Sequence, residues 1–168
     1  MAKTTPRLHL DAALETNVEI ALEKDQGHYL VNVLRHGAGD AVQVFNSADG
    51  EWLAYITETS KKSVRIRIEK KLSEATPPPD IDYLFAPIKH QRLDYLVQKA
   101  TELGARRLRP IITARTIAER VNLDRMRANV VEAAEQCNLV FLPEVHEPQK
   151  FAVVLRSLEP SQIGRAHV

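Results

Sequence analysis

Hydrophobic positions along residues 83–115 change from a continuous run to a helical period and back again. Residues 83–85 are all apolar, and Pro87 closes this run because proline donates no hydrogen bond to a sheet. The apolar side chains then return every three or four residues, as on one face of a helix: Leu93, Leu96, Val97, Ala100 and Leu103. Gly104 stands where a left-handed helix cap is expected, and a second apolar strand follows at residues 108–112. This pattern predicts a βαβ unit and favours a parallel sheet.

The first 74 residues show mainly the alternation that is typical of a sheet. Residues 7–10 and 18–22 alternate between polar and apolar side chains and predict two short strands, and residues 23–35 have helical spacing. Three further strands are predicted at residues 41–45, 52–57 and 63–69. One helix among five short strands indicates a small β-barrel.

A proline-rich segment at residues 75–80 separates this region from the remainder of the chain. Its three consecutive prolines favour an extended path and exclude a helix. We therefore expect a first domain over residues 1–74, a linker over 75–80 and an α/β domain over 81–160. Residues 161–168 have no apolar period, and we interpret them as a non-native tail.

The second region continues with mixed helix and strand signals. A helix is predicted from Asn122, which is a good N-cap residue, and its buried stripe extends to Cys137. Residues 140–145 predict a short strand, and residues 149–158 predict a last helix.

The charge of the chain is unevenly distributed. The 168 residues carry a net charge of only +1, but residues 86–127 have ten Lys and Arg against four Asp and Glu, a local net charge of +6. Such clustering predicts an anionic partner, with nucleic acid as the first candidate. The alternative is a solvated basic face that binds nothing.

Several classes of protein and of site are excluded by the sequence. We find no apolar run long enough to cross a membrane and no signal-peptide core, so we expect no membrane partner. A single cysteine forms no internal disulfide, which favours a cytoplasmic location. No metal-ligand spacing, phosphate-binding glycine loop or nucleophile elbow is found, so the sequence indicates no metal and leaves the catalytic residue unknown.

The basic βαβ stretch offers only single residues as candidates. Lys99 and Glu102 are spaced to form a pair on the predicted helix, and Arg92 lies on the same side. Their functional interpretation is a phosphate or base contact, and the alternative is an ordinary exposed helix pair. Arg115 follows a predicted strand, where α/β sheets bind ligands.

Three motifs in this order resemble the bacterial 16S rRNA uracil-N(3)-methyltransferases of the SPOUT superfamily. They are HYLVNVLRHGAGDAVQVF at residues 28–45, QKATELGARRLRPIITAR at 98–115 and VVEAAEQCNLVFLPEV at 130–145. The resemblance implies a PUA-like RNA-binding barrel followed by a SPOUT-type α/β methyltransferase domain. It also implies a homodimer that uses S-adenosylmethionine to methylate N(3) of one uridine in the 16S rRNA of the small ribosomal subunit.

The resemblance and the charge pattern together lead to a set of expected site residues. Those expected to bind RNA are Arg7, His28, Arg35, Lys89, Arg92, Lys99 and Arg115. Those expected to support the target site are Glu102, Glu135 and Gln136.

The sequence departs from the family at the cofactor site. The family has an Ile-Gly-Pro-Glu-Gly-Gly loop in a C-terminal trefoil knot, whereas here Ile163-Gly164 is followed by Arg165. We therefore expect the knot and the cofactor-binding residues to be missing, and the incomplete sheet to leave an exposed apolar surface. The alternatives are a non-catalytic RNA-binding module and an α/β nucleotide-binding domain, although no phosphate loop favours the latter.

Overall fold

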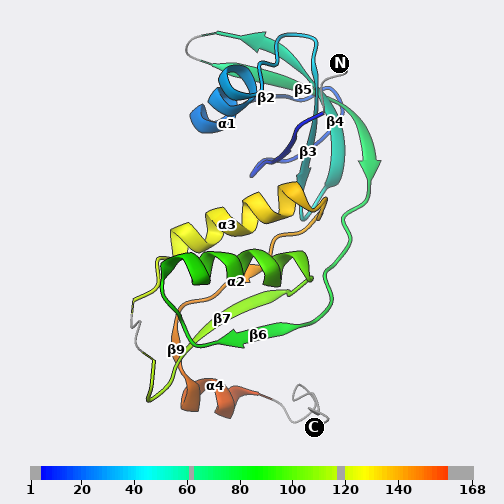
Figure 1. Cartoon of the computed structure of the whole chain (residues 1–168). Helices are drawn as coiled ribbons and strands as arrows, with labels where there is room; N and C mark the ends of the chain where they lie inside the picture. Colours follow the sequence, from blue (N-terminus) through cyan, green and yellow to red (C-terminus); the bar gives the residue numbers. More distant parts are fainter. Residues whose placement is uncertain (1–4, 61–62, 117–119, 159–168) are drawn as a thin grey trace. The chain divides into compact units, whose positions relative to one another are not determined.

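The computed structural model describes residues 5–60, 63–116 and 120–158 (Figure 1). The chain forms two compact units, which we describe separately. The first unit comprises residues 1–77 together with 134–142, and the second comprises residues 78–133 and 143–168. The first unit therefore ends inside the proline-rich segment. The return of residues 134–142 to it has no counterpart in the sequence pattern.

The first unit is built on one five-stranded sheet with the strand order β1-β3-β4-β5-β2. Its elements are β1 (Arg7–His9), β2 (Glu19–Ala21), α1 (Lys24–His28), the π-helix η1 (Tyr29–Val33), β3 (Ala41–Asn46), β4 (Gly50–Thr59) and β5 (Val64–Ser73). All five predicted strands are confirmed. β1 pairs with β3 in parallel, and the other pairs are antiparallel. Within the described residues β1 and β2 do not pair, so hydrogen bonds between the end strands do not close the predicted barrel.

Alternation along the strands decides which side chains enter the core of this unit. On β5 the side chains of Val64, Ile66 and Ile68 are buried, while Arg65 and Arg67 lie on the other face, as their alternation predicts. Leu30 of η1 is fully buried in the same cluster. Each such side chain contributes about 1.5–3 kcal/mol by leaving water, so α1 and η1 are held against the sheet mainly by apolar packing.

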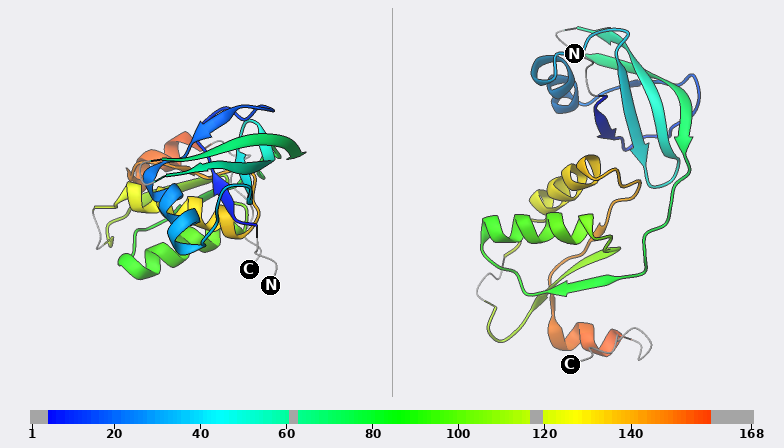
Figure 2. Two further views of the ribbon diagram at one scale, coloured as in Figure 1. Left: turned by 90° about the horizontal axis from the view of Figure 1, so that it is seen from above. Right: turned by 45° about the vertical axis from the view of Figure 1, so that its right-hand side comes forward.

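The second unit is a small parallel sheet with helices on it (Figure 2). Its elements are β6 (Asp82–Phe85), α2 (His90–Glu102), β7 (Arg107–Ile112), α3 (Leu123–Gln136), β8 (Glu144–Val145), β9 (Gln149–Lys150) and α4 (Phe151–Ser157). β7 is central: it pairs with β6 on one side and with the short strands β8 and β9 on the other. α2 and α3 pack side by side, since Asp94 of α2 accepts hydrogen bonds from Arg125 and Asn129 of α3.

The predicted βαβ unit is confirmed. β6 and β7 pair in parallel, and α2 connects them. Gly104 after α2 has a φ of +85°, which is the left-handed cap that its position predicts. Asn122 caps α3, because its side-chain oxygen accepts the Arg125 N–H at 3.0 Å.

Three details of the prediction are wrong. Cys137 is exposed, because α3 ends at Gln136 and Asn138 takes a φ of +56°, so the helical stripe stops one residue earlier. The strand expected over residues 140–145 is reduced to β8. The last helix begins at Phe151, because residues 149–150 pair with β7 instead.

Two further expectations concern the ends of the chain and the membrane. The predicted tail at residues 161–168 lies outside the described residues. Among the helices that the structure describes, none is long and apolar enough to span a bilayer.

Candidate functional site

The carboxyl ends of β6 and β7 lie at the same edge of the sheet, because the two strands are parallel. After β6 the chain reaches Lys89, which is the N-cap residue of α2, and Arg92 lies in the first turn of that helix. After β7 it makes a turn in which the Thr113 N–H donates to Thr116 Oγ1 at 2.8 Å, and Arg115 is exposed in this turn. In open α/β sheets this edge is where ligands bind.

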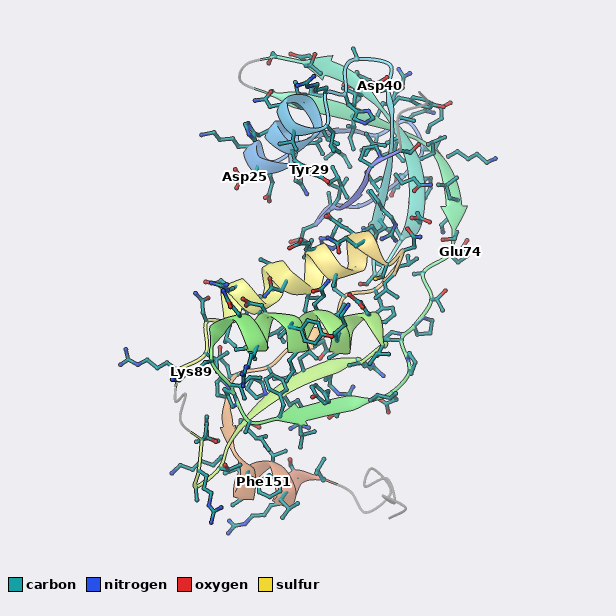
Figure 3. All side chains as sticks on the ribbon, viewed as in Figure 1. Asp25, Tyr29, Asp40, Glu74, Lys89 and Phe151 are labelled. Carbon is teal, nitrogen blue, oxygen red and sulfur yellow. The ribbon has the colours of Figure 1, made fainter. Side chains whose placement is uncertain are left out.

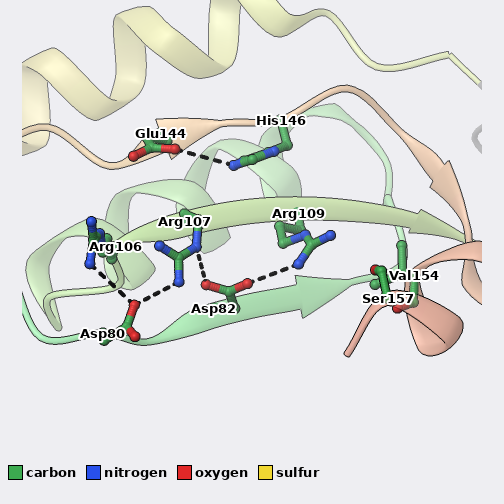
Figure 4. A network of polar contacts seen from close by, with 9 residues as sticks. All are labelled: Asp80, Asp82, Arg106, Arg107, Arg109, Glu144, His146, Val154 and Ser157. Carbon is green, nitrogen blue, oxygen red and sulfur yellow. Dashed lines mark hydrogen bonds and ion pairs between the residues drawn. The ribbon is translucent and has the colours of Figure 1, made fainter. Parts of the chain in front are cut away.

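Most of the other arginines in the basic stretch are neutralised by acidic neighbours. Asp82 lies between Arg107 and Arg109, and Asp80 binds Arg106 and Arg107 (Figure 4). The hydrogen bond from Arg107 and its positive charge lower the pKa of Asp80.

The same neutralisation is found on the helices. Arg125 forms two hydrogen bonds with Asp94, at 2.9 Å and 2.6 Å, which raise the pKa of the arginine. Arg127 pairs with Asp124 at 3.0 Å. A large part of the local charge therefore serves internal ion pairs.

Three of the cations predicted to bind RNA differ from these paired arginines. Within the described part of the chain, Lys89, Arg92 and Arg115 form no ion pair, and all three follow the carboxyl ends of β6 and β7. Figure 3 shows the Lys89 side chain extending away from the ribbon. We call Lys89, Arg92 and Arg115 the cationic edge. Their charges are available to an anionic ligand.

Lys99 and Glu102 lie at the other end of α2 from Lys89. Lys99 Nζ is 2.7 Å and 2.9 Å from the two carboxylate oxygens of Glu102, so these residues form the helix pair that their spacing predicts. A helix rises 1.5 Å per residue, which puts Lys99 roughly 15 Å along the axis from Lys89. The structure therefore does not bring Glu102 to the cationic edge.

A large apolar hollow of about 720 Å³ lies between α2 and the start of β6. Its lining includes the exposed side chains of Ile81, Tyr83, Ile88, Tyr95 and Leu103, and Leu103 is 83% exposed. The expected exposed apolar surface is confirmed at this place. β6 is also the outer strand of the described sheet, so its free edge adjoins the hollow.

Arg7 was predicted to bind RNA, but the structure gives it internal partners. Its side chain is 5% exposed and its guanidinium lies 3.7 Å from the centroid of the Phe45 ring. It binds Glu51 at 2.5 Å and donates to the carbonyl oxygens of Ala134 and Leu139, both at 2.7 Å. Every one of these partners belongs to the first unit. Arg7 thus attaches residues 134–142 to the sheet and does not present its charge to a ligand.

Glu135 and Gln136 lie in the same returning segment as the partners of Arg7. The Glu135 carboxylate accepts the backbone N–H of His9, the last residue of β1, at 2.9 Å. Gln136 is the last residue of α3 and is exposed. Glu135 therefore has a structural partner. Both residues belong to the first unit, whereas the cationic edge belongs to the second.

His28 and Arg35 lie at either end of η1 in the first unit. The Asn32 amide donates to His28 Nδ1 at 2.8 Å, and both side chains are exposed. Arg35 has a φ of +58°, which is uncommon for a residue other than glycine. The sequence predicts an ordinary helix here and misses the π-helix, because the apolar period over five residues does not distinguish the two.

Metal-binding residues are not assembled in the described part of the chain, where no group of three or more His, Cys, Asp or Glu side chains is suitably arranged.

Two family models match the chain. An RNA methyltransferase domain matches residues 75–166, which is more than half of the chain, and an RNA methyltransferase PUA domain matches residues 22–69. The first matched region contains the cationic edge, and the second contains η1.

Similar proteins are known by sequence and by structure. Ribosomal RNA small subunit methyltransferase E of Rickettsia conorii is 30% identical over 142 residues, covering 84% of this chain and 58% of the relative. The protein of the same name from Buchnera aphidicola (Acyrthosiphon pisum) is 27% identical, covering 87% of this chain and 60% of the relative. The chain thus spans about three fifths of the length of these curated relatives.

Solved structures of methyltransferases have a similar fold. A methyltransferase from Legionella pneumophila in complex with the bound cofactor SAM has a TM-score of 0.84 at 25% identity, over 93% of this chain and 67% of that one. A ribosomal RNA small subunit methyltransferase E from Neisseria gonorrhoeae, bound to S-adenosyl methionine, has the same fold with a TM-score of 0.83, 23% identity, and 94% and 67% coverage. The chain therefore belongs to the RNA methyltransferase family that includes the ribosomal RNA small subunit methyltransferases E.

Proposed function

We propose that the full-length protein methylates N(3) of a uridine in 16S rRNA with S-adenosylmethionine, and that this chain supplies RNA-binding surface for that reaction. The observation that carries the proposal is the cationic edge. Among the described residues, Lys89, Arg92 and Arg115 form no ion pair, whereas most of the neighbouring arginines are paired with aspartates. Membership of the RNA methyltransferase family makes RNA the expected anion.

The chemistry of the target constrains how RNA would bind. N(3) of uracil lies on the Watson–Crick edge, so the base must be unpaired or extruded before it reacts. Phosphate contacts from lysine and arginine position the strand without reading its sequence. The cationic edge is suited to that positioning role. Transfer to N(3) also requires removal of its proton or stabilisation of the resulting anion, and we assign neither task to a described residue.

The large hollow does not suit the cofactor. S-adenosylmethionine carries a sulfonium cation, an ammonium group and a carboxylate, and it is cationic overall. Among the described residues that line the hollow, the charged side chains are Arg92 and Lys99, and Lys99 is already paired with Glu102. Arg92 would repel the sulfonium and ammonium groups, and no described lining residue is a carboxylate that could bind them. We therefore place cofactor binding in the part of the longer relatives that this chain does not match, and we derive no step through the cofactor here.

RNA binding by the cationic edge is tested by replacing Lys89, Arg92 and Arg115 together with alanine. The probe is a labelled fragment of small-subunit rRNA, and the dissociation constant is measured as a function of salt. Each lost phosphate contact reduces the magnitude of the slope of log K against log salt by about 0.7–0.9, so a reduction of about 2–3 is expected for the triple variant.

The matched control is Arg127→Ala, which removes an exposed cation of α3 that is paired with Asp124. It should leave the salt slope within about 0.3 of the parent chain. A control loss of about one third of the loss in the triple variant would mean that RNA responds to total charge only, because the control removes one cation and the triple variant three. That outcome would overturn the assignment of the edge.

A second function, a non-catalytic RNA-binding module, is supported by the unsuitable lining of the hollow. Calorimetric titration of S-adenosylmethionine into the 168-residue chain tests where the cofactor binds. No heat of binding is expected from the chain alone. Binding as tight as that of a full-length relative measured in parallel would refute our placement of the cofactor site.

The remaining parts of the proposal concern organisation. We propose that residues 1–74 act as a PUA-like RNA-binding domain and residues 81–160 as part of the SPOUT-type domain, and that the full-length protein works as a homodimer in the cytoplasm. Sedimentation of the full-length protein at several concentrations tests the dimer, and a single monomeric species would exclude it.

A further inference from the structure

We propose that η1 of the first unit binds unpaired nucleotides of single-stranded RNA, with Tyr29 as a stacking platform and the His28–Asn32 pair as the polar contact to a base edge. This inference rests on the proposed function, because it takes RNA as the ligand. We call His28, Tyr29, Asn32, Val33 and Arg35 the η1 patch. Figure 3 labels Tyr29.

The first support is the backbone. η1 is a π-helix of five residues that directly continues α1, and the Leu34 N–H donates to the Tyr29 carbonyl at 3.0 Å. π-Helical turns are rare and occur frequently at functional sites. Arg35, which follows, takes a positive φ that costs a non-glycine residue about 1–2 kcal/mol. The π-helical turn and the positive φ of Arg35 thus lie next to each other and next to the exposed side chains.

The second support is that some side chains of η1 are buried and others are exposed. Leu30 is fully buried in the core, and Val31 and Leu34 pack against the same cluster. Tyr29 and Val33 contribute little to that packing, since their side chains are 43% and 57% exposed. An exposed aromatic ring beside an exposed aliphatic side chain offers the flat apolar surface on which an unstacked base is held.

The third support is the polar pair beside that surface. Because His28 Nδ1 accepts the hydrogen bond from Asn32, a neutral His28 ring carries its proton on Nε2 and is a donor there. The Asn32 amide offers both a donor and an acceptor group. A nucleobase edge presents donors and acceptors side by side, so this pair has the chemistry that hydrogen bonding to a base requires.

The fourth support is a hollow of about 420 Å³ beside the pair, within the first unit. Its lining combines apolar side chains such as Leu22 and Val64 with Asn32, His28 and the hydroxyl residue Ser63. Its volume lies in the range of small-molecule sites, and its wall also contains the charged side chains of Glu23 and Lys24. Gly27 packs closely against this wall, because a Cβ there would lie 3.0 Å from a Val64 methyl group.

The test compares two probes with the full 168-residue chain: a labelled single-stranded oligouridylate of about 12 nucleotides and a duplex RNA of similar length. Tyr29→Ala should weaken binding of the single strand about tenfold, because stacking on one aromatic ring is lost. Binding of the duplex should change less than about twofold, since its bases remain stacked on each other. Tyr29→Phe should restore the single-strand affinity.

A matched control and the salt dependence complete the test. Leu72→Ala truncates a comparably exposed apolar side chain on β5 of the same unit and should leave both affinities unchanged. Tyr29→Ala should not alter the salt slope, because stacking releases no counterions. Near-identical affinities of Tyr29→Ala and the parent chain for the single strand would overturn the inference and leave the cationic edge standing. Failure of the parent chain to bind any RNA would overturn the proposed function as well.

Discussion

At the scale of single residues, the most informative side chain of the first unit is Arg7. Its guanidinium stacks on Phe45, pairs with Glu51 and satisfies two backbone carbonyl groups near the end of α3. A planar guanidinium with five donors is suited to such a set of partners, and a lysine is not. The residue therefore determines where residues 134–142 lie within the unit.

Replacing Arg7 with methionine tests this structural role. The variant keeps a long apolar side chain but leaves Glu51 and the carbonyl groups of Ala134 and Leu139 without their donor. Removal of one partner from a buried pair costs about 3 kcal/mol, so the free energy of unfolding should fall by that amount in urea denaturation. Arg67→Met, at an exposed position of β5, should change it by less than about 0.5 kcal/mol. Equal effects of both substitutions would contradict the role.

His9 should make stability depend on pH. Burial lowers the pKa of its imidazole from 6.5, and the nearby Asp11 opposes this only in part. The unfolded chain then binds a proton that the folded chain resists, so the free energy of unfolding should decrease as the pH falls below 6.5. In His9→Gln the decrease between about pH 7 and pH 5 should be smaller than in the parent chain. Parallel pH profiles of the two proteins would show that His9 does not contribute.

At the scale of elements, tight turns determine how the strands of the first unit connect. Gly39, before β3, has a φ of +89° and open space around it, whereas Gly50, at the start of β4, has a φ of +84° and lies against other backbone. A Cβ on Gly50 would lie 2.2 Å from the Ser73 carbonyl oxygen. Conformation alone therefore requires glycine at the first position, and both conformation and space require it at the second.

Alanine substitutions separate these two causes. Gly39→Ala should destabilise the chain by about 1 kcal/mol through its positive φ alone, and Gly50→Ala by about 3 kcal/mol through strain and overlap together. Gly37→Ala is the control, because its backbone φ is not in the positive region and nothing lies within 4 Å of the added atom. The measurement is thermal unfolding of the three variants. Equal losses at Gly37 and Gly39 would contradict the strain argument.

At the scale of the whole molecule, the second unit exposes a group of large apolar side chains around one hollow. The hollow beside β6 is bordered by a free sheet edge and by large side chains such as Tyr95 and Leu103. Contiguous exposed patches of this kind mark interaction surfaces. The relatives that match this chain are longer than it, by about two fifths of their own length.

The native chain should bind a hydrophobic fluorescent dye at this hollow. Leu103→Lys should lower the dye fluorescence by about half, because it places a charge at the most exposed apolar side chain of the lining. Leu72→Lys, on the first unit, should leave the signal unchanged. Absence of dye fluorescence from the folded parent chain would show that the hollow is not an accessible apolar surface.

Features that depend only on neighbouring residues can be predicted from the sequence. The alternation of Val64, Ile66 and Ile68, the helical period of α2 and the cap at Gly104 each follow from neighbouring residues. Neighbouring residues do not predict which arginines form ion pairs. Whether Arg107 or Arg115 is neutralised depends on Asp80 and Asp82, which lie more than 20 positions before either in the chain.

Local periodicity, composition and short motifs predict the order of strands and helices, the parallel βαβ unit, the cationic character of residues 86–127 and the resemblance to RNA methyltransferases. The folded chain adds that Arg7 is buried and that, among the described residues, Lys89, Arg92 and Arg115 form no ion pair. It also shows that η1 is a π-helix with Tyr29 exposed. These outcomes depend on which distant groups come within hydrogen-bonding distance, and residue spacing along a chain does not contain that information.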